Sequence, residues 1–256
     1  MSDVARLFGI PVAKLTEPQA VERIVSLAKE GRASRGRAAL VATLNVDFVC
    51  NAVRCWPFGG NDELWGYLRN SDLVTADGMP LVWLSRLLFD PIPARVTGAD
   101  MVPSICRRCA EEGLSVYVLG GDGKAVEEAF AKMGGKSARV AGIDPAFVNL
   151  DDGSTEIVER INAAKPDILF VALGNPKQEL WMGRNASRLD VPVMMGVGGT
   201  FNFIAGRVKR APGWMQRCGL EWTYRIVQEP GRLWRRYAYG LVKFSWLSAR
   251  ALLGGW

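Results

Sequence analysis

The residues best suited to chemistry lie where apolar segments end. Asp77 closes such a segment in Thr75-Ala-Asp-Gly78 and places a carboxylate at the start of a loop. The chain has no histidine, which excludes His-based triads, His-rich zinc sites and imidazole bases. Proton transfer near neutral pH then falls to a carboxylate, Cys, Lys or Tyr side chain. Asp77 is the leading candidate base, and a helix cap is the alternative from spacing alone.

A second polar motif, Gly174-Asn-Pro-Lys-Gln-Glu179, predicts a helix start that faces an anion. Pro176 suits the first turn of a helix, which puts Lys177 and Gln178 at its N-terminus. An ordinary helix start capped by Asn175 is the alternative. A cap does not explain a lysine in the first turn, where its charge opposes the helix dipole. We therefore favour a binding function for this motif.

Glycine pairs end two other apolar segments. Gly120-Gly121 and Gly198-Gly199 could turn backbone N–H groups toward a phosphate, although glycine is also common in plain turns. The first pair is not a dinucleotide fingerprint, because GxGxxG would need glycine where Val126 stands. This disfavours a nucleotide-dependent oxidoreductase, while two glycine-rich strand ends favour a nucleotide or nucleotide-sugar site.

The charged residues near these motifs favour chemistry without a metal. Arg95 follows a proline-containing loop, where it could meet an anionic group or form a surface ion pair. No Asp-x-Asp motif occurs, so the usual aspartate pair for a divalent metal that bridges a diphosphate is missing. We expect no metal site and no bound cofactor.

These motifs need a parallel sheet to bring them together. Five short apolar segments that end in Gly, Asn or Asp are typical of buried parallel strands: Ala38–Asn45, Ser71–Gly78, Ser115–Gly121, Asp167–Gly174 and Val191–Gly199. Helical patterns alternate with them: Val46–Cys55, Pro80–Leu88, Ala99–Glu112, Lys124–Met133, Ser154–Ala164 and Gln178–Ser187. This order predicts an α/β fold, an open, mostly parallel, Rossmann-like sheet with helices on both faces. Ligands bind at the carboxyl ends of such strands, so Thr43 and Asn45 would share one edge with Asp77.

Positive charge and aromatic rings gather at the end of the chain. Residues 206–256 hold ten Lys/Arg against two Glu, and five of the nine tryptophans, whereas residues 1–205 hold 22 basic and 24 acidic side chains. We expect an α/β core over 1–205 and a C-terminal helical appendage over 206–256. A basic, aromatic segment suits a phospholipid surface or nucleic acid.

Helical geometry favours the membrane for this appendage. If residues 232–252 form one helix, Arg232, Arg236, Lys243 and Arg250 make one basic stripe, with aromatic and aliphatic side chains on the far side. That pattern is typical of a helix at a membrane interface. A helix packed on the core with a solvated basic face is the alternative.

Composition also indicates the compartment. No segment reaches about 18 uncharged apolar residues, as a membrane crossing needs, and the N-terminus has no signal-peptide pattern. The five cysteines form no disulfide framework and are expected to be reduced structural thiols. We expect a cytoplasmic protein that lies on a membrane and does not span it.

Taken in order, the motifs resemble those of one family. They are Thr43-Leu-Asn45, Ala76-Asp-Gly78, Arg95-Val-Thr-Gly98, Gly120-Gly121, Gly174-Asn-Pro-Lys-Gln-Glu179, Gly196-Val-Gly-Gly-Thr-Phe201, Ala205-Gly206, Lys209-Arg-Ala-Pro212, Gly219-Leu-Glu-Trp222, Arg225 and Glu229-Pro-Gly-Arg-Leu-Trp-Arg-Arg236. This series, from about Thr43 to Tyr237, resembles the WecG/TagA/CpsF family of bacterial glycosyltransferases.

The resemblance implies a metal-independent, inverting hexosyltransferase of cell-surface polysaccharide biosynthesis. Its donor would be a UDP-sugar, a co-substrate that supplies a hexose or N-acetylhexosamine, such as N-acetylmannosamine or glucose. Its acceptor would be a saccharide linked to undecaprenyl diphosphate. The resemblance also implies that Asp77 is the catalytic base and that four further residues line the pocket: Thr43, Asn45, Arg95 and Gln178.

The resemblance gives the appendage a part in the site. Arg225, Arg232 and Arg235 would close the pocket and meet the lipid diphosphate at the inner face of the bacterial plasma membrane. For the nucleotide-sugar, the strand-end motifs predict contacts from Gly120, Gly121, Asn175, Lys177, Gly198, Gly199 and Asn202.

Two positions depart from the family pattern and leave the donor sugar open. Asn202 stands where the family usually has Asp, and Pro145-Ala-Phe147 stands where it often has Gly-Tyr-Phe. A non-catalytic nucleotide- or nucleic-acid-binding protein with a basic tail is the alternative function. For the enzyme we expect no nucleic-acid partner, and a homo-oligomer is left open.

Overall fold

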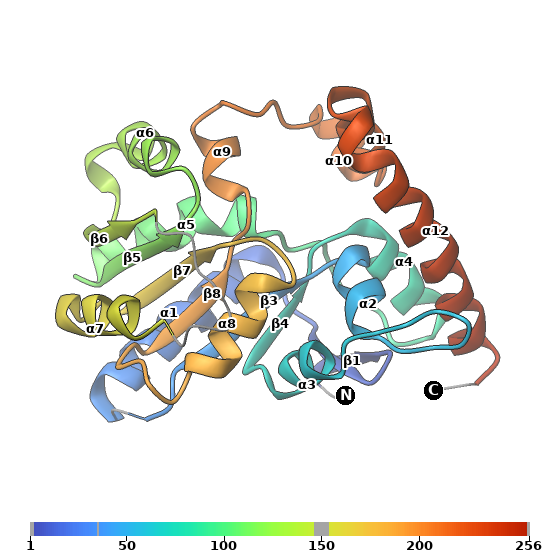
Figure 1. Ribbon diagram of the computed structural model, residues 1–256, viewed down its shortest axis with the longest axis horizontal. Helices are drawn as coiled ribbons and strands as arrows, with labels where there is room; N and C mark the ends of the chain where they lie inside the picture. Colours follow the sequence, from blue (N-terminus) through green and yellow to red (C-terminus); the bar gives the residue numbers. More distant parts are fainter. Residues whose placement is uncertain (1–2, 35, 146–153, 255–256) are drawn as a thin grey trace.

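A parallel sheet forms the centre of the protein (Figure 1). The structure, a computed structural model, describes residues 3–34, 36–145 and 154–254, and no side chain for Lys136 and Arg232. Within these residues the strands are β1 Val4–Leu7, β2 Ile10–Ala13, β3 Ala39–Leu44, β4 Leu73–Ala76, β5 Ser115–Gly120, β6 Arg139–Asp144, β7 Ile168–Ala172 and β8 Val193–Gly196. Six of the described strands form one sheet in the order β4-β3-β8-β7-β5-β6, and every neighbouring pair is parallel.

Helices follow the strands along the described chain. They are α1 Glu17–Ser34, α2 Val46–Ala52, α3 Asp62–Asn70, α4 Met79–Leu87, α5 Gly98–Glu111, α6 Gly123–Met133, η1 Gly134–Lys136 (a 3-10 turn), α7 Thr155–Ala164, α8 Lys177–Asn185, α9 Thr200–Ile204, α10 Gly213–Arg217, α11 Glu221–Gln228 and α12 Pro230–Leu252. Together with the parallel sheet, this alternation confirms the predicted Rossmann-like α/β fold.

Burial on both faces explains why the strands are continuously apolar. In β3, Leu40 and Ala42 pack with α2, α3, α4, α7 and α8 on one face of the sheet. Val41, the residue between them, packs with α1, α5, α6 and α9 on the other face. Successive side chains of a strand point to opposite faces, so a strand covered on both sides must be apolar at every position.

Several elements were not predicted from the sequence. The antiparallel hairpin of β1 and β2 consists of two four-residue strands, which are too short to give a periodic signal. β6 is a partly exposed edge strand with Arg139 and Asp144 at its ends, so it lacks the apolar run of the inner strands. Ala146 and Phe147, part of a motif that departs from the family, lie outside the described residues.

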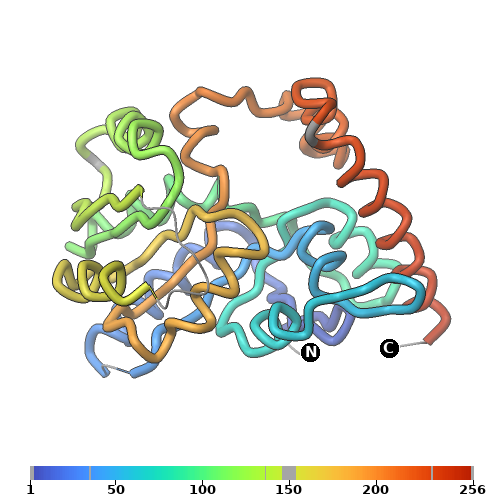
Figure 2. The backbone as a smooth tube through the Cα atoms, viewed as in Figure 1, coloured from blue at the N-terminus to red at the C-terminus, as the bar shows by residue number. Residues whose placement is uncertain are grey.

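The C-terminal segment leaves the sheet after α9 and returns along the side of the core. Figure 2 shows it crossing the top of the view to α10 and α11 and descending as α12. α12 is a single helix over Pro230–Leu252, which confirms the predicted helix. Leu233 and Leu247 are buried, and the ring of Phe244 lies 6.0 Å from that of Phe8. The helix is therefore packed on the core.

This packing corrects the predicted basic stripe. Lys243 is 0% exposed, and its ammonium donates to the backbone carbonyls of Cys50 and Gly59. Those carbonyls replace water around the charge, which a buried ammonium requires. The prediction that Lys243 faces lipid headgroups is wrong. Among the described helices, α12 included, none combines the length and apolar character needed to cross a bilayer.

The five cysteines are free thiols, as predicted. Cys106 and Cys109 lie buried on α5, and burial raises the pKa of each thiol to about 12. A thiol that stays protonated at neutral pH is a poor nucleophile and metal ligand. The Cys-x-x-Cys spacing therefore has a structural explanation.

Phe170 on β7 tests how far the fold depends on its central strands. Its side chain is fully buried and its ring centroid lies 6.2 Å from that of Phe201 on α9. We expect Phe170→Ala to lower the free energy of unfolding by about 3–5 kcal/mol, because the lost transfer energy adds to a cavity. Urea denaturation measures this loss, and a value below about 1 kcal/mol would contradict the tight packing.

Candidate active site

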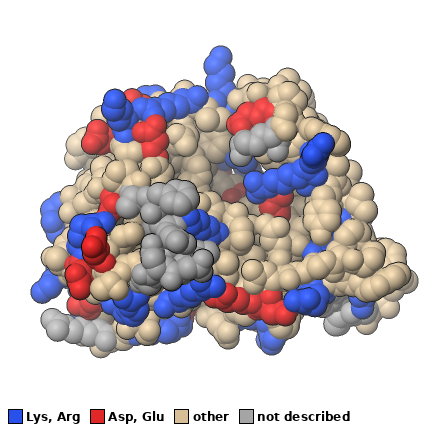
Figure 3. All heavy atoms as spheres, in the orientation of Figure 1, with Lys and Arg blue, Asp and Glu red and all other residues tan. Residues whose placement is uncertain are grey.

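A cavity of about 440 Å³ lies between the carboxyl ends of the strands and the C-terminal helices. Figure 3 shows the hollow, with acidic and basic side chains around it. Residues from the sheet edge line it: Thr43, Asn45, Asp47, Asp77, Thr97, Gly174, Asn175, Gln178, Gly198, Gly199, Thr200 and Asn202. Residues from the C-terminal segment line it as well: Arg210, Glu221, Arg225, Gln228, Glu229, Leu233, Arg236 and Tyr237. The core and the appendage thus build one site.

Asp77 lies at the end of β4, in the wall of this cavity. Its backbone N–H donates to the carbonyl of Leu44 at 2.7 Å, which extends the pairing with β3. Burial raises the pKa of its carboxyl from 3.8 to about 7, although the guanidinium of Arg95 and two other arginines oppose this. A carboxylate with such a pKa accepts protons well near neutral pH.

Gln178 joins two of the strand-end loops. Its Oε1 accepts hydrogen bonds from the backbone N–H groups of Gly174 and Gly198, both at 3.1 Å. A Cβ on Gly196 would lie 2.6 Å from Gln178 Nε2 and 2.9 Å from Glu179 Oε1. A side chain at position 196 would therefore displace Gln178 or Glu179. Gln178 holds the loops after β7 and β8 together.

The side chain of Asn175 forms hydrogen bonds to two other side chains of the protein. Its Nδ2 donates to Glu179 Oε2 at 3.1 Å, and its Oδ1 accepts from Asn51 Nδ2 at 2.6 Å. Burial raises the pKa of Glu179 to about 8, with hydrogen bonds from Gln178 and Asn175 opposing the shift. This row of side chains supports the start of α8, where Gln178 lies.

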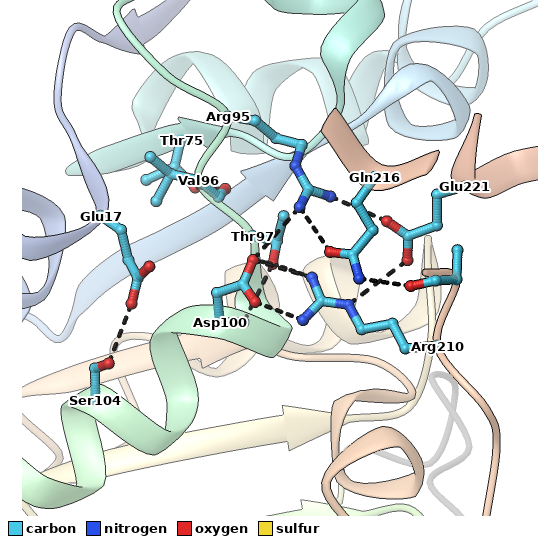
Figure 4. A network of polar contacts seen from close by, with 11 residues as sticks. Glu17, Thr75, Arg95, Val96, Thr97, Asp100, Ser104, Arg210, Gln216 and Glu221 are labelled. Atoms are coloured by element: carbon cyan, nitrogen blue, oxygen red, sulfur yellow. Dashed lines mark hydrogen bonds and ion pairs between the residues drawn. The ribbon is translucent and has the colours of Figure 1, made fainter. Parts of the chain in front are cut away.

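Arg95 contacts the appendage rather than the cavity. Its Nη1 donates to Glu221 Oε2 at 3.0 Å and its Nη2 to Gln216 Oε1 at 3.1 Å. Arg210 pairs with Asp100 on α5, where its Nη2 lies 2.9 Å from Oδ2. Figure 4 shows these five side chains pointing toward one another. Arg95, expected in the pocket wall, instead helps to clamp α10 and α11 onto the core.

A second ionic contact lies at the start of α12. Arg236 Nη2 is 2.7 Å from Asp47 Oδ2, and both residues line the cavity. Arg225, also in the lining, places its guanidinium 4.9 Å from the ring centre of Phe203. Arg235 is not among the lining residues, and its guanidinium lies 5.5 Å from the ring of Trp234.

Three residues predicted to contact the nucleotide-sugar lie outside the lining of this cavity. Gly120, Gly121 and Lys177 do not line the cavity. Gly120 has φ +84°, and a Cβ there would lie 2.6 Å from Leu173 Cδ2, so the turn and its packing already require glycine. Gly198, Gly199 and Asn202 do line the cavity. Their contact with a nucleotide-sugar stays a prediction.

Comparison with known proteins decides the family. The model of the glycosyl transferase WecG/TagA/CpsF family matches residues 5–256. The chain belongs to this family.

Two relatives carry the same descriptive name, N-acetylglucosaminyldiphosphoundecaprenol N-acetyl-beta-D-mannosaminyltransferase. One, from Bacillus spizizenii, is 29% identical over 224 residues, which cover 84% of this chain and 83% of the relative. The other, from Bacillus subtilis, is 28% identical over 200 residues, which cover 77% and 74%. Family membership makes this chain a transferase rather than a non-catalytic binding protein or an oxidoreductase.

In this WecG/TagA/CpsF glycosyltransferase, five charged residues of the described cavity wall were not among the predicted ones: Asp47, Arg210, Glu221, Glu229 and Arg236. The residues of the appendage that were predicted to close the pocket are Arg225, Arg232 and Arg235. The signal was present for the four missed residues of the appendage, since all of them lie in the motifs that carry the family resemblance. Their spacing alone could not show which of them face the core. The side chain of Arg232 is outside what the structure describes.

Glu179 should make stability depend on pH. Its carboxyl has a pKa of about 8 in the folded protein and about 4.5 in the unfolded chain. Between these values only the folded state holds the proton, so the free energy of unfolding should fall as pH rises through this window. Glu179→Gln removes this titration and should flatten the decline, as urea denaturation from about pH 5 to about pH 9 would measure.

The matched control for this experiment is Glu159→Gln, which changes an exposed glutamate on α7. It should leave the pH dependence of stability as in the wild type. An equal decline in Glu179→Gln and the wild type would contradict a buried, protonated Glu179.

Proposed function

We propose that this protein is an inverting glycosyltransferase with a UDP-sugar donor and an undecaprenyl-diphosphate-linked acceptor. The donor sugar is a hexose or N-acetylhexosamine, and the acceptor is a lipid-linked saccharide of cell-surface polysaccharide biosynthesis. The names of the two relatives, which specify N-acetylmannosaminyl transfer to a diphosphoundecaprenol-linked sugar, support this substrate class. The position of Asp77 in an arginine-lined cavity at the ends of the strands is the observation that carries the proposal.

In this mechanism Asp77 takes the proton from the attacking hydroxyl of the acceptor. The hydroxyl oxygen forms a bond to the anomeric carbon while the bond from that carbon to the diphosphate breaks. The electron pair of the broken bond leaves with UDP, and the configuration at the anomeric carbon inverts. A pKa of about 7 suits Asp77 to this step, because the carboxylate is both populated and basic near neutral pH.

Arginine side chains supply positive charge for the two diphosphates. Arg210, Arg225 and Arg236 line the cavity, and guanidinium groups bind phosphate oxygens through paired N–H donors. Such fixed donors stabilise the charge that develops on a leaving diphosphate. We propose that they act without a metal ion.

Replacing Asp77 with Asn tests the base. Asn has nearly the same shape but accepts no proton, so turnover should fall about 100-fold to 10 000-fold. The assay offers a panel that includes UDP-N-acetylmannosamine and UDP-glucose, with lipid-diphosphate-linked N-acetylglucosamine as acceptor. UDP binding, measured by calorimetry, should remain. Near-normal turnover of Asp77→Asn would contradict the role of Asp77.

We also propose that α12 and the loop before α3 rest on the inner face of the bacterial plasma membrane. The side chains of Trp56, Leu241 and Val242 are 82%, 60% and 59% exposed. They line one apolar groove of about 680 Å³ together with Phe58 and Trp246. The right-hand side of Figure 3, over α12, is mostly uncharged. Exposed aromatic and aliphatic side chains of this kind suit the acyl boundary of a leaflet.

The double variant Leu241→Glu, Val242→Glu tests this surface without removing α12, whose Lys243 and Leu247 belong to the core. Two charges in place of apolar side chains should weaken binding to phosphatidylglycerol vesicles about tenfold or more. The matched control, Ala131→Glu, adds a charge to an exposed site of α6 at the other end of the view in Figure 1. Co-sedimentation of the double variant at the wild-type level would contradict the membrane surface.

A further inference from the structure

One glutamate of the appendage lines the same cavity as the candidate base and contacts two arginines. Glu221, the first residue of α11, lines the cavity with Asp77. Its Oε2 accepts from Arg95 Nη1 at 3.0 Å, and its Oε1 lies 3.8 Å from Arg210 Nε. The side chain is 23% exposed and those of the two arginines 16% and 24%, so water screens this group only in part.

Asp77 faces charges from every element that closes on it. Arg95 comes from the loop before α5, Arg210 from the segment before α10, and Arg225 from α11. Glu221 is the negative charge among these neighbours. The other charged residues of the cavity wall include a pair between α2 and α12, Asp47 with Arg236, and Glu229 before α12.

We propose that Glu221 is a positioning residue that sets the proton affinity of Asp77 when the appendage is docked. It does so in two ways. Its carboxylate accepts from Nη1 of Arg95, so this guanidinium is bound to the appendage, and it lies 3.8 Å from Nε of Arg210. Its own negative charge stands in the same cavity as Asp77 and favours the protonated form of that side chain.

Its place in the cavity wall distinguishes Glu221 from Asp100. Asp100 pairs with the same two arginines, at 2.9 Å from Arg210 and 3.6 Å from Arg95, but it belongs to α5 in the core and does not line the cavity. Glu221 arrives only with α11. The appendage therefore brings the like charge of Glu221 into the cavity together with Arg210 and Arg225, whose positive charges act on Asp77 in the opposite direction.

The catalytic consequence rests on the proposed function, but the proton affinity of Asp77 can be measured without any substrate. Full-length protein labelled with ¹³C at aspartate carboxyls is titrated by NMR, and the signal missing in Asp77→Asn identifies Asp77. In Glu221→Gln the proton affinity of Asp77 should fall about tenfold relative to the wild type, the effect of one neighbouring charge. Glu221→Asp keeps the charge and should retain a higher proton affinity than Glu221→Gln.

The matched control is Glu229→Gln, which neutralises another glutamate of the appendage in the same cavity wall. It should leave the Asp77 titration unchanged. An Asp77 titration that is the same in Glu221→Gln and the wild type overturns the proposal, as does a fall of equal size in Glu229→Gln. Loss of sugar transfer does not enter this readout, so a failure of the proposed function would be seen separately in the turnover assay.

Discussion

The site depends on one constraint, a partly buried carboxyl group that shares its cavity with arginines of a helical segment from the far end of the chain. Without the C-terminal helices, Asp77 would be a solvated carboxylate at the open edge of the sheet. The C-terminal helices cover it, and burial raises its pKa to about 7 in spite of three nearby guanidiniums. Desolvation therefore exceeds the attraction of the arginines, which is the condition for a useful base near neutral pH.

The appendage achieves this because it is packed as part of the core. Lys243, a residue of α12, is buried against the core, and its ammonium donates to the carbonyls of Cys50 and Gly59. Ionic contacts fix the cavity end of the appendage, Arg95 with Glu221 and Arg236 with Asp47. The same helix exposes apolar side chains along its outer side. One segment thus lines the site and carries the apolar surface that we propose rests on the membrane.

The sequence predicted the parallel sheet and the strand-end cluster because both follow from local patterns. A continuous apolar strand signals burial on two faces, and parallel strands bring Thr43, Asn45 and Asp77 to one edge. Longer-range pairings were not predictable in this way. A lysine at position 243 fits a solvated stripe by periodicity, and only the carbonyls of residues nearly 200 positions away reveal its burial. Likewise, Arg95 was expected to meet substrate, since nothing local shows that Glu221 and Gln216 reach it.

The pH dependence of sugar transfer tests the central claim most directly. If Asp77 is the base and its pKa is about 7, kcat/KM should rise about tenfold per pH unit in acid and level off above about pH 7. A profile that stays level down to about pH 5 would contradict the claim, because it would place the essential base at the pKa of an ordinary exposed aspartate.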